Sequence, residues 1–166
     1  MTNQAMKERL GVAPAGFRTP GGFHPGLADR PDVQAMLQRI GFDWVSSKYP
    51  AHLYGKPPAG PAEADFESIL AAQKPAQPFV YPSGLIELPM NPISDVTAFR
   101  SGRWKLEAFV EAVERAVRWT IERGAVFDFL AHPSVLGVMD PGFRTIDRIC
   151  SLVEQSQGRS EEHTSE

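Results

Sequence analysis

The strongest hydrophobic pattern in the chain has the period of an α-helix. Residues 104–123 carry apolar side chains three and four positions apart, which predicts one long helix that ends at Gly124. Its apolar face comprises Leu106, Phe109, Val110, Val113, Val117 and Ile121. The same spacing predicts four more helices, at residues 2–10, 31–40, 62–73 and 143–153. In the helix at residues 31–40, Gly41 is expected to end the helix. One buried face is expected, formed by Val33, Met36, Leu37 and Ile40.

Short apolar runs between these helices predict strands. They are bounded by Pro and Gly clusters and cover residues 16–18, 42–45, 79–81, 85–88 and 125–131. Strands therefore alternate with helices along most of the chain. Such alternation is typical of βα units with a parallel sheet, either open or closed into a barrel. The predicted fold class is α/β.

Composition and charge narrow the range of partners. The chain has 166 residues and a formal net charge of −3, with scattered basic residues, so nucleic acid is not an expected partner. No apolar run is long enough to span a membrane, and the first residues do not form a secretory signal. The location stays open, because the true N-terminus is expected to be missing from this sequence, and a cytoplasmic location is favoured. The single Cys150 lies in an apolar helical pattern, which predicts a buried, inert thiol.

The last eight residues, RSEEHTSE, have no apolar periodicity. They match the translation of a common sequencing adapter, so residues 159–166 are interpreted as a read-through tail and set apart from the domain at residues 1–158. The alternative is a natural disordered tail.

Two polar side chains follow predicted strands. Arg18 lies between an aromatic residue and the rigid turn of GFRTPGG, and His132 directly follows the run DFLA. The carboxyl ends of strands in a parallel α/β sheet face the ligand site, and histidine can give or take a proton near neutral pH. The alternatives are a solvated arginine at a strand end and a histidine that caps a loop.

Four stretches together resemble a known enzyme family. GFRTPGG, GFDWVSSKYP, LIELPMNPISD and VFDFLAHPS with GVMDPGFRTID are similar to the later part of polysaccharide deacetylases, the NodB-homology group or carbohydrate esterase family 4. The branch most similar to this chain includes peptidoglycan deacetylase-like and allantoinase-like amide hydrolases. The resemblance covers most of residues 5–156 and implies the C-terminal part of a distorted (β/α) barrel.

The resemblance also implies an activity and a set of site residues. The activity is hydrolysis of a carbon–nitrogen amide bond in a polysaccharide, in peptidoglycan or in a small amide, aided by a divalent metal, usually zinc. Arg18 matches the arginine that orients the family's catalytic base, and His132 matches the histidine that protonates the leaving amine. Asp95 is the candidate carboxylate that orients His132 and favours its protonated form. Trp44 and Leu130 are candidates for the substrate pocket wall, with ordinary core packing as the alternative for both.

The family's metal-binding motifs, an Asp-Asp pair and a His-x-x-x-His pair, do not occur in this sequence. They would lie upstream of Met1, so the chain is interpreted as a fragment that lacks the metal half. Zinc is expected in the complete parent and no metal is expected on this chain. Whether the chain alone is an enzyme stays open. The alternative function is a non-catalytic remnant that binds carbohydrate or a protein partner.

Overall fold

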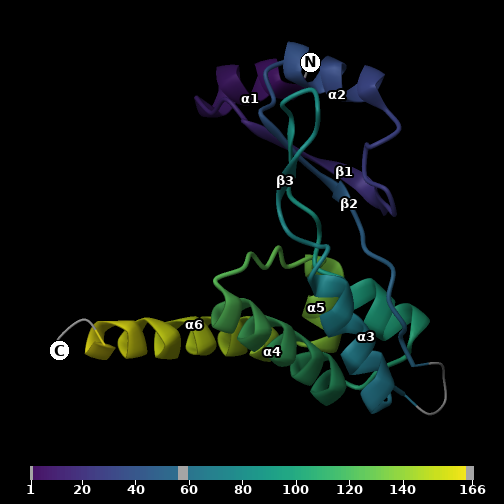
Figure 1. The fold of residues 1–166 in the computed structure, drawn as a ribbon, viewed down its shortest axis with the longest axis vertical. Helices are drawn as coiled ribbons and strands as arrows, with labels where there is room; N and C mark the ends of the chain where they lie inside the picture. Colours follow the sequence, from purple (N-terminus) through teal and green to yellow (C-terminus); the bar gives the residue numbers. More distant parts are fainter. Residues whose placement is uncertain (1, 56–59, 164–166) are drawn as a thin grey trace. The chain divides into compact units, whose positions relative to one another are not determined.

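A computed structural model describes residues 2–55 and 60–163 of the chain (Figure 1). The fold is mixed α/β, and about half of the chain is helical. The chain divides into two compact units, which are described separately below. The first comprises residues 1–50 and 78–90, and the second comprises residues 51–77 and 91–166.

The first unit is built on a small mixed sheet. Within the described residues, this sheet has the strand order β1-β2-β4-β3. The strands are β1 (Gly16–Phe23), β2 (Trp44–Lys48), β3 (Phe79–Val80) and β4 (Ile86–Glu87). β1 and β2 pair in parallel, as do β2 and β4, whereas β3 is antiparallel to β4.

The expectation of a wholly parallel sheet is therefore wrong for β3. A tight turn joins β3 to β4, and in it the Gly84 N–H donates to the Tyr81 carbonyl at 2.8 Å. Gly84 has φ +89°, which a glycine adopts without a steric penalty. A turn this short reverses the chain, so the two strands must run in opposite directions.

The strand boundaries in this unit differ from the prediction for local reasons. β2 begins at Trp44 rather than at residue 42, because the Phe42 N–H donates to the Leu37 carbonyl and thereby ends the preceding helix. β1 continues through Pro20 to Phe23 rather than stopping at Arg18. Its pairing with β2 is irregular between Arg18 and Phe23, as expected where a proline interrupts a ladder.

Two helices accompany the sheet, α1 (Thr2–Leu10) and α2 (Pro31–Arg39). The apolar face predicted for α2 is only partly buried. Leu37 is buried in the core, while Met36 and Ile40 are exposed. The hydrophobic core of this unit is small and consists of Leu27, Leu37, Phe42, Val45, Tyr81 and Leu85.

A buried carboxylate connects the strands of this unit. Glu87 is fully buried and accepts hydrogen bonds from the Ser47 N–H, the Ser47 hydroxyl, the Lys48 N–H and the Tyr81 hydroxyl, at 2.6 to 2.8 Å. The Tyr81 hydroxyl also accepts a hydrogen bond from the Leu27 N–H at 2.8 Å. Burial and the hydrogen bond to Glu87 raise the pKa of Tyr81 to about 12. These four hydrogen-bond donors offset the free-energy cost of burying the Glu87 carboxylate.

In the described part of the second unit, the regular elements are helices. It contains α3 (Glu63–Gln73), the π-helix η1 (Val96–Ser101), α4 (Leu106–Arg123), α5 (Pro133–Met139) and α6 (Arg144–His163). The predicted helix at 104–123 is confirmed apart from its first two residues, and Gly124 ends it in the left-handed conformation at φ +57°. η1 and α5 were not predicted.

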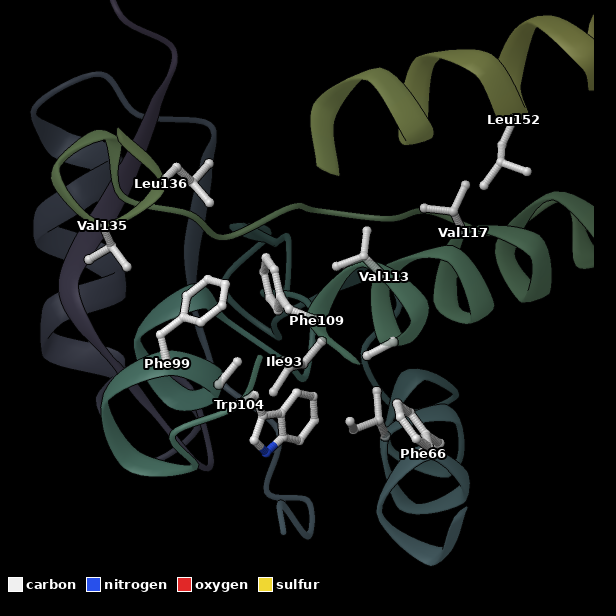
Figure 2. Packing of buried hydrophobic residues seen from close by; sticks show 13 residues of the cluster. Phe66, Ile93, Phe99, Trp104, Phe109, Val113, Val117, Val135, Leu136 and Leu152 are labelled. Atoms are coloured by element: carbon white, nitrogen blue, oxygen red, sulfur yellow. The ribbon is translucent and has the colours of Figure 1, made fainter. Parts of the chain in front are cut away.

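The apolar face of α4 forms the centre of this unit's core (Figure 2). Phe109 is fully buried, and its ring centroid lies 4.9 Å from that of Phe99. Leu152 of α6 points toward Val117 of α4, so the two helices pack along one another (Figure 2). An ion pair adds to this contact, since Arg148 of α6 donates two hydrogen bonds to Glu114 of α4, at 2.6 and 2.7 Å.

The strand predicted at residues 125–131 does not form. Phe127, Phe129 and Ala131 pack against the core at every second position, as they would in a strand. Among the residues that the structure describes, however, no strand pairs with this segment in a continuous ladder of hydrogen bonds. Beside it, residues 91–95 lead into η1, and the Asn91 N–H donates to the Asp128 carbonyl at 2.9 Å. Alternating burial without a neighbouring strand therefore gives an extended segment rather than a strand.

The last helix is longer than predicted. α6 begins at Arg144 and continues to His163, so it includes the first part of the segment interpreted as a read-through tail. Residues 164–166 lie outside the described residues. The prediction of a buried Cys150 is wrong, because its side chain is exposed. The side of α6 that faces α4 carries Ile146, Ile149 and Leu152, and Cys150 lies beside this face. Among the described helices, none has the length and apolar character needed to cross a membrane.

Candidate functional site

Asp95 and His132 form a closely bonded pair in the second unit. One carboxylate oxygen of Asp95 accepts the backbone N–H of His132 at 2.7 Å, and the other lies 2.8 Å from its ring nitrogen Nδ1. Asp95 is fully buried, whereas 48% of the His132 side chain is exposed. The pair therefore has a buried anchoring group and a solvent-facing imidazole.

The local fold explains why these two residues meet. Residues 91–95 run beside residues 128–132, joined at one end by the Asn91–Asp128 backbone bond and at the other by the Asp95–His132 contacts. Asp95 immediately precedes η1 and accepts the Val96 N–H at 2.8 Å. His132 has extended backbone angles and immediately precedes α5, whose first residue is Pro133.

This geometry defines the proton positions on the imidazole. Each Asp95 oxygen already accepts a backbone N–H, from His132 or from Val96, so the carboxylate acts as an acceptor. Nδ1 must then carry the hydrogen that bridges the 2.8 Å contact. In the neutral ring, Nε2 is consequently the free base, and in the charged ring it carries the proton that can be donated. Asp95 and His132, both predicted site residues, are thus in direct contact, and the catalytic roles predicted for them stay predictions.

Of the other predicted site residues, Leu130 belongs to the second unit, and Arg18 and Trp44 belong to the first. Leu130 is half-buried and occupies the position between Phe129 and Ala131, which pack against the core. Arg18 and Trp44 belong to the first unit, where Arg18 is exposed on β1 and is in register with Ser46 of β2. The joint placement of Arg18 with His132 stays a prediction.

Trp44 has a clear packing role. Its indole covers Gly16 so closely that a Cβ atom at this position would lie 1.8 Å from the ring. Only glycine permits this approach. The observation favours the core-packing alternative over a pocket wall for Trp44.

Metal-ligating side chains do not cluster in the described part of the chain. The described residues contain no group of three or more His, Cys, Asp or Glu side chains that could hold a metal ion. Both oxygens of Asp95 are occupied by N–H donors, which leaves Nε2 of His132 as a single potential ligand. His52 is also tied to its own loop, with Nδ1 2.6 Å from the Leu53 carbonyl, and burial lowers its pKa.

Glu87, the buried carboxylate of the first unit that accepts four hydrogen bonds, was not among the residues singled out from the sequence. The signal for it was a charged residue inside the apolar run of residues 85–88, since a carboxylate in such a run must be paired or hydrogen-bonded.

Comparisons with protein-family models, with curated proteins and with solved structures give no match for this chain.

Proposed function

We propose that this chain carries the acid–base part of an amide hydrolase of the polysaccharide deacetylase type, acting on an N-acyl group of a saccharide. The observation that carries the proposal is the two-point contact between Asp95 and His132, which fixes a ring whose side chain is about half exposed. The sequence resemblance supplies the reaction class.

The chemistry of amide hydrolysis explains the role of His132. When the carbon–nitrogen bond breaks, the departing nitrogen would become an amine anion unless it received a proton. His132 in its charged form donates the Nε2 proton to that nitrogen as the bond breaks and becomes neutral. Asp95 acts as a positioning residue, because it holds Nδ1–H and stabilises the charged ring before the transfer.

The remaining residues have secondary places in this proposal. Arg18 would orient the catalytic base that the family resemblance implies. Leu130 would line the substrate pocket near His132. The parallel strands β1, β2 and β4 would belong to the distorted barrel of this class. No step is assigned to a metal bound by this chain.

The test is an assay of acetate release from N-acetylglucosamine oligomers and peptidoglycan, with allantoin hydrolysis in parallel, each with and without added zinc. His132→Ala should lower kcat by about a hundredfold or more, with a much smaller change in KM. His52→Ala is the matched control and should keep wild-type turnover. Wild-type kcat in His132→Ala would contradict the proposal. Saccharide binding without hydrolysis would favour the non-catalytic carbohydrate-binding alternative.

A further inference from the structure

A hollow of about 730 Å³ lies between the ends of α3 and α4 in the second unit. Its volume is within the range of small-molecule sites in proteins. Its lining combines apolar side chains, an aromatic ring and two cations: Leu70, Ala71, Lys74, Gln77, Trp119, Arg123, Gly124 and Ala125.

The positive charge in this hollow has a structural origin. Lys74 occupies the C-cap position of α3, and Arg123 is the last residue of α4. The C-terminal end of a helix carries partial negative charge and therefore stabilises cations. Among the described residues, no acidic side chain lines the hollow. Arg123 pairs with Glu122 at 3.3 Å, but both side chains are more than half exposed. Lys74 has no ion pair in the part of the chain that the structure describes.

The walls of the hollow are held in place. The Arg123 guanidinium lies over the Trp119 ring, 4.9 Å from its centroid, which limits the directions in which Arg123 can point. The Gln77 amide accepts the Val126 N–H at 2.8 Å and donates to the Val126 carbonyl at 3.2 Å. Gln77 thereby links the residues that follow α3 to the segment that follows α4.

This hollow is separate from the Asp95–His132 pair. Ala125, at its edge, begins the extended segment whose far end is His132. A ligand in the hollow would therefore contact different residues from a ligand at the imidazole.

We infer that the hollow binds a carboxylate-bearing sugar unit, such as a hexuronic acid residue of an acidic glycan. The carboxylate pairs with Arg123 and Lys74, and the C–H face of the sugar ring lies on the floor formed by Leu70, Ala71 and Trp119. The anionic character follows from the charges of the hollow, whereas the choice of a sugar rests on the proposed function.

The test is titration of the full chain with trigalacturonate, followed through the Trp119 indole N–H by NMR and by calorimetry. Trigalacturonate should shift the Trp119 signal, and Arg123→Gln and Lys74→Gln should each weaken binding by about tenfold or more. Arg118→Gln is the matched control, since Arg118 lies on α4 but outside this hollow, and it should leave binding unchanged.

Three other results would overturn the inference. They are equal binding of the neutral maltotriose, equal binding of benzoate or inorganic phosphate, and unchanged trigalacturonate binding in Arg123→Gln. The test is independent of catalysis, because His132→Ala should bind trigalacturonate as the wild type does. If trigalacturonate does not bind while amide hydrolysis depends on His132, the hollow is wrongly assigned and the proposed function stands.

Discussion

The buried carboxylate of Asp95 holds His132 at both its backbone N–H and its ring nitrogen Nδ1, at 2.7 and 2.8 Å. A contact to the ring alone would leave the backbone free to move, and a contact to the backbone alone would leave the ring free to rotate. The two contacts together fix the direction of Nε2. Preorganisation of this kind is what a proton donor needs in order to act on a bound substrate.

Asp95→Asn should destabilise the second unit. The amide keeps only one oxygen, so one of the N–H donors now held by Asp95 loses its acceptor inside the protein. The expected cost is about 1 to 3 kcal/mol, measured as a lower free energy of unfolding in urea. Asp140→Asn is the matched variant, because Asp140 is equally buried and accepts the N–H groups of Arg144 and Thr145. A wild-type unfolding free energy for Asp95→Asn would show that its bonds are unimportant for stability.

Glu87→Gln should destabilise the first unit by about 3 kcal/mol. The carboxylate accepts four hydrogen bonds, and the amide nitrogen of glutamine would face donors rather than acceptors. Urea unfolding measures the loss. Glu107→Gln is the control, since the Glu107 side chain is 70% exposed in its pair with Arg144, and it should leave the free energy of unfolding close to the wild-type value. Equal effects of the two substitutions would contradict the role given to Glu87.

The contact between α4 and α6 should weaken in acid. The hydrogen bonds from Arg148, and then those from Arg118, lower the pKa of Glu114 from its ordinary value of 4.5 to about 2. Because the folded pKa lies below the unfolded one, the stabilisation is fully present above pH 4.5 and is lost as the pH falls toward 2. With allowance for solvent screening, its size is about 1 kcal/mol.

The measurement is the free energy of unfolding between about pH 6 and about pH 2 for wild type and Glu114→Gln. The substitution should reduce the acid dependence, whereas Glu122→Gln, in an exposed pair with Arg123, should keep the wild-type dependence. Identical pH profiles for wild type and Glu114→Gln would rule out this contribution.

Helices were predicted from sequence more accurately than strands. The apolar spacing of α4 and the glycine after it fix both its buried face and its end, because both signals are local. The strand at 125–131 failed because alternation reports burial on one face and not the presence of a neighbour. α5 was not predicted, although its first residue is Pro133 and proline is common at the start of helices.

The candidate site was predicted in part. The resemblance named Asp95 as the carboxylate partner of His132, and the structure places the two side chains in contact. The packing of Trp44 on Gly16 could not be predicted, since it depends on how β1 and β2 pair. The exposure of Cys150 could not be predicted either, because a stripe of apolar residues along a helix does not indicate which of its edges the neighbouring helix covers.

The most direct test of the account is the protonation pattern of the His132 ring, measured by nitrogen NMR across a pH titration of the full chain. We predict that the neutral ring carries its hydrogen on Nδ1, that Asp95→Asn removes this preference, and that Asp140→Asn preserves it. A neutral ring protonated on Nε2, or a pattern that Asp95→Asn leaves unchanged, would contradict the role of Asp95 and His132 as a proton-transfer pair.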